Sequence, residues 1–413
     1  MKRNIFSFWL LAFLTLATAC DRPAQVDDSA SQEVPGVEND LIRIGSSLAL
    51  SGHASFLGVN TLRGAQAYIN DVNDNGGVHG RKIKLIALDD KYDPPLCIAN
   101  TQRLLVEENV FALFCFVGTP TTVKIIPLVE RARIPLIGMF TGANALRSPF
   151  HRYIINVRAS YYQETGAAVR HIVDDLGIKK IAVFYQYDAY GLDGLRGAEL
   201  ALQKYNAAPV AKGSYIRGTL NVEEGLNAVL NSGAEAVVMI GTYEPCAKFI
   251  RLAKNSDKKL LFYNVSFVGA EELARLLGKD GDGVIVSQVV PPPELPETRS
   301  MLTEVDRYIE LLKRYFPDVK ANSVSLEAYF NAMVLVEGLK RAGRDLTRER
   351  LIDAIETISA YPLNKDNVIS FSSTDHQGMD KVYFTVIENE RLVLLTDWAK
   401  LARDFKPPVS EQP

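Results

Sequence analysis

The chain has 413 residues, with 46 Lys and Arg against 49 Asp and Glu, so its formal net charge is −3. A composition of 47% hydrophobic residues, 28 Gly and 19 Pro excludes a disordered, collagen-like or disulfide-scaffold protein. No run of Lys and Arg is interleaved with aromatic residues, which excludes a nucleic-acid-binding surface. Because single hydrophobic cores stop growing near about 250–300 residues, the length predicts two lobes.

The first 19 residues predict an export signal. A basic pair precedes the apolar run 5–16, which is too short to span a bilayer because spanning takes about 20 apolar residues. Small residues then lead to Cys20, as in bacterial lipoprotein signals, so we expect Cys20 to be lipidated. The alternative is a plain signal cut after Ala19. Residues 20–41 are polar and acidic and predict a flexible tether.

From Leu41 onward, short apolar runs rich in β-branched residues alternate with segments of helical period. This alternation is typical of parallel sheets covered by helices on both faces, so the sequence predicts an α/β fold. The expected strands are 42–50, 83–88, 110–117, 134–140, 181–185, 236–241, 260–265 and 284–290.

The C-terminal third has a different pattern, in which helices come before strands. Three prolines at 291–293 predict a linker there, because proline donates no hydrogen bond to a sheet. The expected helices are 298–315, 323–342 and 347–358, and the expected strands are 368–371, 382–387 and 392–395.

No motif in the sequence indicates catalysis, a cofactor or a metal: the P-loop, nucleophile-elbow, zinc-protease, C-x-x-C and EF-hand patterns are missing. Gly191, Gly194 and Gly197 do not have the spacing of a dinucleotide-binding loop, and close packing at a helix start accounts for them. Cys246 has no histidine pattern to support a catalytic role. We therefore expect neither an enzyme nor a bound cofactor or metal.

Two further cysteines leave a choice open. Cys97 lies near an expected helix start and Cys115 at the end of an expected strand. In an exported protein they could form a disulfide bond. The alternative is two buried thiols, because sequence spacing does not fix the geometry that a disulfide requires.

Several segments, in order, resemble type I periplasmic binding proteins of the Leu/Ile/Val-binding branch, which serves ABC importers. They are SG at 51–52, RGA at 63–65, NDNGGVHGRK at 73–82, DDKYDP at 89–94 and YQYDAYG at 185–191. The resemblance covers about residues 42–400.

This resemblance implies two Rossmann-like lobes with parallel sheets, joined by a hinge of three crossovers, with the ligand held in the cleft between them. It also implies a disulfide between Cys97 and Cys115. The implied lobes are 42–158 with 291–375, and 159–290 with 376–413; the crossovers lie near 158–159, 290–291 and 373–378.

Ligands of open α/β sheets lie beside the carboxyl ends of strands and the helix starts that follow. The segments 116–119 and 140–143 fit this position, and their threonine hydroxyls and glycine amides could hold a carboxylate; helix capping by Thr119 and Thr141 is the alternative. The expected ligand-binding residues are Phe56, Leu57, Phe116, Gly118, Thr119, Phe140, Thr141, Gly142, Tyr190, Tyr243, Glu244, Ser266 and Phe267.

One of these residues departs from the pattern of the amino-acid binders. They place an acidic residue, which holds the ligand's ammonium group, where this chain has Ser266. A buried ammonium group without a charged partner costs several kcal/mol. The substitution therefore predicts a neutral or acidic, rather hydrophobic ligand, unless Glu244 or Asp188 supplies the missing carboxylate.

Together these features predict a monomeric periplasmic lipoprotein that touches the membrane only through its anchor and binds no nucleic acid. It would close its lobes on a small, rather hydrophobic organic ligand, amino-acid-like or a carboxylate, and deliver it to an ABC permease in the inner membrane. The alternative is a carrier or sensor of a lipid, sterol-like or aromatic-acid ligand that feeds a receptor or another transport system.

Overall fold

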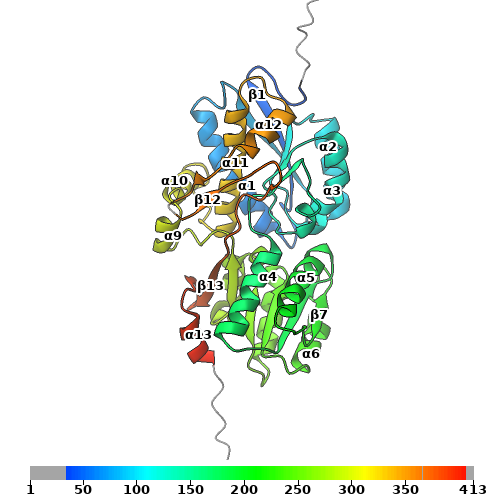
Figure 1. The fold of residues 1–413 in the computed structure, drawn as a ribbon, viewed down its shortest axis with the longest axis vertical. Helices are drawn as coiled ribbons and strands as arrows, with labels where there is room; N and C mark the ends of the chain where they lie inside the picture. Colours follow the sequence, from blue (N-terminus) through cyan, green and yellow to red (C-terminus); the bar gives the residue numbers. More distant parts are fainter. Residues whose placement is uncertain (1–33, 365, 406–413) are drawn as a thin grey trace, which may run out of the picture. The chain divides into compact units, whose positions relative to one another are not determined.

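The computed structural model describes residues 34–364 and 366–405 (Figure 1). The predicted signal, Cys20 and the tether as far as residue 33 lie outside these residues. The last part of the predicted tether is folded: Val37 forms a bridge to Ile42, and Gly36 is buried against the backbone of Phe111. Only glycine fits there, since its φ is 75° and a Cβ would lie 2.2 Å from the Phe111 nitrogen.

The first sheet has five parallel strands in the order β2-β1-β3-β4-β5. Its strands are β1 (Leu41–Leu48), β2 (Lys82–Asp89), β3 (Ala112–Phe114), β4 (Leu136–Ile137) and β5 (Ile154–Ile155). The helices that alternate with them are α1 (Ser55–Asp74), α2 (Pro94–Val106) and α3 (Thr119–Ala132), with a 3₁₀ turn η1 (Asn144–Leu146) before β5.

The second sheet has seven strands in the order β14-β13-β10-β9-β8-β6-β7. Five are parallel, and β13 and β14 add an antiparallel hairpin at one edge. The strands are β6 (Ile181–Gln186), β7 (Lys212–Tyr215), β8 (Ala236–Ile240), β9 (Leu261–Asn264), β10 (Ile285–Gln288), β13 (Tyr383–Glu388) and β14 (Arg391–Leu394). The helical segments are α4 (Tyr161–Arg170), η2 (His171–Asp175), α5 (Ala189–Gln203), α6 (Glu223–Leu230), α7 (Tyr243–Lys254), η3 (Ser266–Val268), α8 (Ala270–Leu277), η4 (Gly278–Gly281) and α13 (Trp398–Phe405).

The chain crosses between the two sheets three times: between β5 and α4, between β10 and α9, and between β12 and β13. This is the two-lobed α/β fold that the sequence predicts. The segments of the C-terminal third are α9 (Pro296–Met301), α10 (Val305–Tyr315), α11 (Ser323–Ala342), α12 (Arg348–Glu356), β11 (Tyr361–Pro362) and β12 (Val368–Ile369).

One expected helix is broken in two. The sequence predicts a continuous helix over 298–315, but Leu302 has an extended backbone, with φ −140° and ψ 111°. The neighbouring Thr303 donates both its backbone N–H and its hydroxyl to the carbonyl of Leu363, each at 2.8 Å. A long-range contact therefore overrides the helical pattern at this point.

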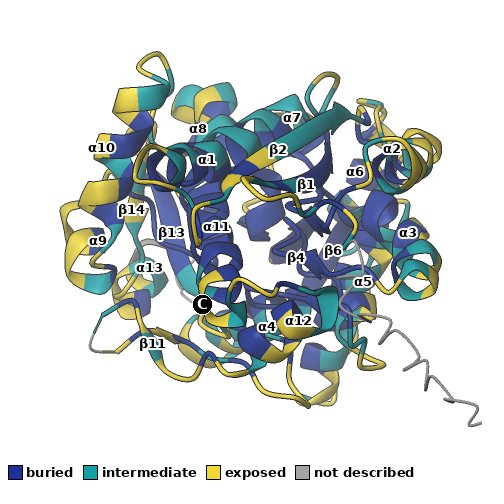
Figure 2. Ribbon diagram, turned by 90° about the horizontal axis from the view of Figure 1, so that it is seen from above, coloured by how far each residue is buried: buried dark blue, intermediate teal, exposed yellow. Residues whose placement is uncertain are grey.

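The long helix α11 has the limits that the sequence predicts, and it is buried along most of its length (Figure 2). It packs against α1, where Gly64 touches the backbone of Ser325: a Cβ on Gly64 would lie 1.9 Å from the Ser325 carbonyl oxygen. This glycine lets the two helices approach closely. No helix among the described residues is long and apolar enough to cross a membrane.

The predicted disulfide is wrong, because Cys97 and Cys115 are both buried free thiols. They belong to different core clusters: Cys97 to the cluster that contains Leu113, and Cys115 to the cluster that contains Phe114. Cys115 has a φ of 53°, which interrupts the strand alternation that would have turned it toward the same face as Leu113. Its sulfur instead lies 3.8 Å from the side-chain nitrogen of Asn331.

Candidate functional site

The residues predicted to bind ligand all follow the carboxyl end of a parallel strand. Open α/β sheets bind their ligands at this edge. Phe56 and Leu57 follow β1, 116–119 follow β3, 140–142 follow β4, Tyr190 follows β6, Tyr243 and Glu244 follow β8, and Ser266 and Phe267 follow β9.

Two threonines of the first lobe form a polar pair. The hydroxyl oxygens of Thr119 and Thr141 lie 2.6 Å apart, and Thr141 donates to the hydroxyl of Tyr161 at 3.3 Å. Thr119 does not cap α3: it is the first residue of that helix, and its N-cap, Gly118, makes no side-chain cap bond. Gly142 permits close packing, because a Cβ there would lie 2.7 Å from Tyr161. The hydroxyl pair is thus held at the edge where a polar ligand group would lie.

Phe267 lies in a box of aromatic rings, which we call the aromatic box. Its ring centroid is 4.7 Å from that of Tyr190, 5.6 Å from Phe140 and 5.9 Å from Tyr92, all in tilted arrangements. Tyr161 packs behind Tyr190 at 5.3 Å. Phe267 is 0% exposed. Tilted ring pairs at these separations are favourable, so the box is a specific apolar site.

The other expected residues are less closely gathered. Phe56 lies edge-on to Tyr243 at 6.1 Å, and its backbone N–H donates to the Tyr243 hydroxyl at 3.4 Å. Leu57 packs beside Gly269, next to the turn that carries Phe267. Phe116 is buried in the core of the first sheet, whereas Glu244 is exposed on the first turn of α7.

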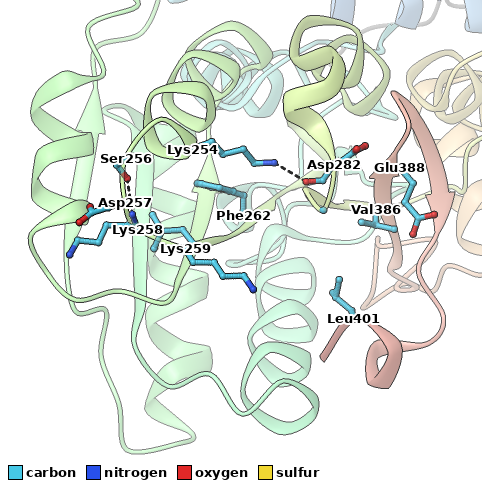
Figure 3. A pocket seen from close by; sticks show the side chains of 12 residues that line it. Lys254, Ser256, Asp257, Lys258, Lys259, Phe262, Asp282, Val386, Glu388 and Leu401 are labelled. Atoms are coloured by element: carbon cyan, nitrogen blue, oxygen red, sulfur yellow. Dashed lines mark hydrogen bonds between the residues drawn. The ribbon is translucent and has the colours of Figure 1, made fainter. Parts of the chain in front are cut away.

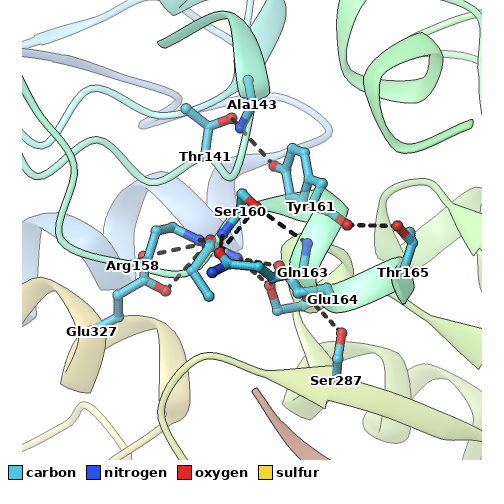
Figure 4. Close-up of polar contacts among 12 residues, drawn as sticks. Thr141, Ala143, Arg158, Ser160, Tyr161, Gln163, Glu164, Thr165, Ser287 and Glu327 are labelled. Atoms are coloured by element: carbon cyan, nitrogen blue, oxygen red, sulfur yellow. Dashed lines mark hydrogen bonds and ion pairs between the residues drawn. The ribbon is translucent and has the colours of Figure 1, made fainter. Parts of the chain in front are cut away.

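Figure 4 shows a buried group of charges, which we call the ionic cluster. It comprises Arg158, Glu164 and Glu327, whose side chains are 1%, 0% and 3% exposed. Arg158 donates to Glu164 at 2.9 Å and lies 3.3 Å from a Glu327 oxygen. Its guanidinium carbon is also 5.3 Å from the centre of the Phe140 ring. Arg158 lies at the first crossover, Glu164 on α4 and Glu327 on α11, so the cluster joins the two lobes.

Ser266 contacts a carboxylate that belongs to another element. Its backbone N–H donates to Glu164 at 2.8 Å and its hydroxyl donates to Glu164 at 3.0 Å. Arg158 also donates to the Ser266 hydroxyl. Glu164, on α4, is thus the carboxylate in contact with Ser266, and Arg158 is its ionic partner. Asp188 does not contribute a carboxylate here, since its side chain caps α5 by accepting from the backbone of Tyr190 at 3.0 Å.

A cavity of about 10 Å³ adjoins Ser266 and Phe140 and is also lined by Glu271, Gln288 and Glu327. Two buried atoms of these residues, Oε2 of Glu271 and Nε2 of Gln288, make no hydrogen bond within the described residues. Buried polar atoms of native proteins are mostly hydrogen-bonded, either to protein or to ordered water.

Burial raises the pKa of two carboxyls on this cavity. For Glu327 burial raises the pKa to about 7, although Arg158 opposes the shift. For Glu271 burial also raises the pKa, while hydrogen bonds from Ser323 oppose it. Above a pH of about 7, where Glu327 is ionised, the ionic cluster carries a formal charge of −1; below it, Arg158 balances Glu164 and the cluster is neutral. The cavity wall therefore favours a cationic group only when Glu327 is ionised.

A larger groove, of about 590 Å³, lies away from this site (Figure 3). It adjoins the residues just before β9 and β10, which is the amino end of these strands. Ligands of open α/β sheets bind at the other edge. Its charges are also balanced: the lining residues include Lys254, Lys258, Lys259, Asp257, Asp282 and Glu388.

Comparisons with known proteins agree with this geometry. The sequence matches the family described as periplasmic binding protein over residues 41–391. It is 25% identical over 312 residues to Leu/Ile/Val-binding protein homolog 7 of Brucella abortus. The aligned region covers 73% of this chain and 77% of that protein.

Solved structures show the same fold. A possible leucine/isoleucine/valine-binding protein from Rhodopirellula baltica is 35% identical, with a TM-score of 0.82 over 90% of this chain and 99% of that chain. A fatty acid ABC transporter substrate-binding protein from Thermomonospora curvata, 21% identical, has a TM-score of 0.79 over 90% of this chain and 96% of that chain.

The predicted fold and the predicted family are thus both confirmed. The match spans both sheets and every strand except the last residues of the β13–β14 hairpin. The chain belongs to the periplasmic binding protein family, and it is therefore an extracytoplasmic solute-binding protein rather than an enzyme.

Proposed function

We propose that this protein captures a small hydrophobic ligand bearing an ammonium and a carboxylate group, as amino acids do, and delivers it to an ABC importer. The observation that carries the proposal is the cavity beside Ser266, where Glu271 and Glu327 face a buried space with orphaned polar atoms. An ammonium group there would be attracted by the net negative charge that the ionic cluster carries once Glu327 is ionised. Relatives named as Leu/Ile/Val-binding proteins support the same ligand class.

The ligand's carboxylate would lie at the first lobe. Thr119 and the backbone beside Gly118 lie at the start of α3, where helix N–H groups favour negative charge, and the Thr141 hydroxyl lies 2.6 Å from that of Thr119. Capture would then work by closure, because a ligand that contacts both lobes favours the closed state. The lobes in this proposal are 42–158 with 291–375, and 159–290 with 376–413.

A thermal-shift titration with leucine and phenylalanine tests the proposal. We expect both to raise the melting temperature of the wild-type protein, and Thr141→Val to reduce the shift strongly because it removes a hydroxyl from the carboxylate site. Thr374→Val, at an exposed position of the third crossover, is the matched control and should leave the shift unchanged. If neither amino acid shifts the wild type, the proposed ligand class is wrong.

A ligand without an ammonium group, such as a lipid or an aromatic acid, is the second candidate. It is favoured by the aromatic box, whose rings offer an apolar surface larger than a small aliphatic side chain needs. In the same titration, this candidate predicts shifts with 4-methylpentanoate and 3-phenylpropanoate that exceed those with leucine and phenylalanine.

We also propose that the mature protein is a monomer tethered to the membrane by a lipid on Cys20. The sequence around Cys20 supports this, with an apolar run followed by small residues. Labelling of cells with an alkyne fatty acid should mark the wild-type protein and should not mark Cys20→Ser. Labelling of both proteins, or of neither, would contradict the anchor.

A further inference from the structure

A second polar pocket, of about 210 Å³, lies at the crossovers that join the two sheets, and we call it the hinge pocket. Its lining residues come from two stretches of the chain: 146–156, around β5, and 374–377, in the third crossover. None of these residues is among those predicted to bind ligand at the strand ends, and none lines the cavity beside Ser266. The hinge pocket is therefore a separate space from the candidate site.

The walls of the hinge pocket are held by hydrogen bonds between the two stretches. The backbone N–H of Asn156 donates to the carbonyl of His376 at 2.8 Å, and the N–H of Gly378 donates to the carbonyl of Asn156 at 2.8 Å. The Nε of Arg147 donates to Oε1 of Gln377 at 2.7 Å. The pocket is thus a preformed space with fixed walls, as small-molecule sites usually are.

The lining offers both a hydrogen-bond acceptor and hydrogen-bond donors. Asn156 is 2% exposed and donates through Nδ2 to the carbonyl of Leu146 at 2.8 Å, whereas its Oδ1 accepts no hydrogen bond from the described residues. Arg147 donates three hydrogen bonds, fewer than the N–H groups that a guanidinium carries. A hydroxyl group fits such a mixed lining, because it both donates and accepts.

The charges of the lining are balanced. Arg147 and Asp375 are the two lining residues with a permanent charge, and their charges are opposite. Two histidines also line the pocket, and each lies against a glutamate: His151 at 3.0 Å and His376 at 3.1 Å. A charged ligand would gain no net attraction from this lining, so the hinge pocket favours an uncharged one.

Phe150 supplies an apolar wall. It is 46% exposed, and its ring centroid lies 4.7 Å from that of His376 in a tilted arrangement. The face of an aromatic ring is negative, so it attracts the slightly positive C–H groups of a molecule that lies on it. Sugars and polyols present such C–H groups together with hydroxyls.

We propose that the hinge pocket binds a small uncharged molecule with several hydroxyl groups, either a single sugar ring or a polyol of similar size. Its hydroxyls would donate to Oδ1 of Asn156 and accept from Arg147, and its C–H groups would pack on Phe150. The volume of about 210 Å³ suits this size, since a cavity of about 150 Å³ holds benzene. The proposal goes beyond the proposed function and does not depend on which ligand the cleft takes.

Calorimetric titration of glucose and of myo-inositol tests the proposal. We expect at least one of them to bind the wild type, and Phe150→Ala to weaken that binding by at least about fivefold, which corresponds to about 1 kcal/mol. Because Phe150 is half exposed, this variant should fold. Tyr187→Ala is the matched control: it removes an aromatic ring that is 60% exposed, outside the hinge pocket, and should keep the wild-type affinity.

Three outcomes would overturn the proposal. If neither glucose nor myo-inositol binds the wild type, the hinge pocket is not a site for hydroxylated molecules. Equal affinity of Phe150→Ala and the wild type, or loss of binding in the cleft variant Thr141→Val, would place the sugar elsewhere. Tighter binding of gluconate or glucosamine than of glucose would contradict an uncharged ligand. None of these results bears on the amino-acid ligand of the cleft, which the leucine titration decides separately.

Discussion

The aromatic box and the ionic cluster are both buried at the junction of the lobes, but they are held in different ways. The box consists of uncharged rings in tilted contact at 4.7–5.9 Å. The cluster consists of charges joined by directed bonds, such as the 2.9 Å bond from Arg158 to Glu164. A ring in the box can be exchanged for another ring, whereas removal of a charge leaves its partner uncompensated. The first region is therefore suited to ligand exchange and the second to fixing the hinge.

The largest loss of stability is expected when the ionic cluster loses Arg158, its only cation. Arg158→Met leaves Glu164 and Glu327 buried without their ion-pair partner, and breaking such a pair destabilises a protein by about 3–5 kcal/mol. Denaturant unfolding measures this change. The matched control is Arg152→Met, which also removes an arginine that contacts several carboxylates, but one whose side chain is 39% exposed.

Exposed pairs contribute about 0–1 kcal/mol, so the control should be nearly neutral. Similar losses for Arg158→Met and Arg152→Met would show that the cluster has no special role in the hinge.

A smaller effect on the free energy of unfolding is expected from the titration of Glu327. Its folded-state pKa is about 7, above the ordinary value of 4.5, so between these pH values the folded protein retains a proton that the unfolded chain has released. The stability of the wild type therefore falls as pH rises through this window, by up to about 3 kcal/mol. Glu327→Gln cannot titrate and should lack this loss. Urea unfolding at pH 5 and pH 8 measures the difference.

Glu310→Gln, at an exposed position of α10, should keep the wild-type dependence. The same slope in the wild type and Glu327→Gln would disprove the assignment.

The aromatic box should be stabilised more by the packing of its rings than by the hydrogen bonds of its hydroxyl groups. Tyr190 donates a hydrogen bond to the carbonyl of Gly241 at 3.3 Å, so Tyr190→Phe should reduce the unfolding free energy by about 1 kcal/mol. Tyr190→Ala also removes the ring and should cost about 3–5 kcal/mol. Denaturant unfolding of both variants measures the contrast. Equal losses would mean that the hydroxyl, rather than the ring, holds this wall of the box.

The smallest effect on stability is expected when the protein is treated with a reducing agent. Cys97, Cys115 and Cys246 are buried free thiols, and burial raises the pKa of each, so they should be unreactive in the folded protein. A reducing agent should leave the melting temperature unchanged, and alkylation of these thiols should require unfolding. A clear fall in melting temperature on reduction would restore the disulfide that the family resemblance implies.

Much of the fold follows from sequence periodicity, as the matching limits of α11 show. Two features escape periodicity: the long-range bond from Thr303 to Leu363 breaks a predicted helix, and the positive φ of Cys115 turns its thiol away from Cys97.

The site was predictable only in part. The strand-end rule places Thr141, Tyr190 and Phe267 correctly at one edge of the sheets, but it cannot find Glu164 and Glu327, which reach the same place from helices. Glu327 does leave a signal, because it is an acidic residue within the otherwise apolar stretch of α11. Glu164 leaves none, since an acidic residue in a first helical turn is ordinarily explained by the helix dipole.

The most direct test of the account is whether the cleft recognises an ammonium group through Glu327. Calorimetry with phenylalanine and 3-phenylpropanoate, on the wild type and Glu327→Gln at pH 8, isolates that group. The account predicts that the wild type prefers phenylalanine and that Glu327→Gln loses most of this preference, by about tenfold or more, which corresponds to about 1.4 kcal/mol. Tighter binding of 3-phenylpropanoate to the wild type, or an unchanged preference in Glu327→Gln, would contradict it.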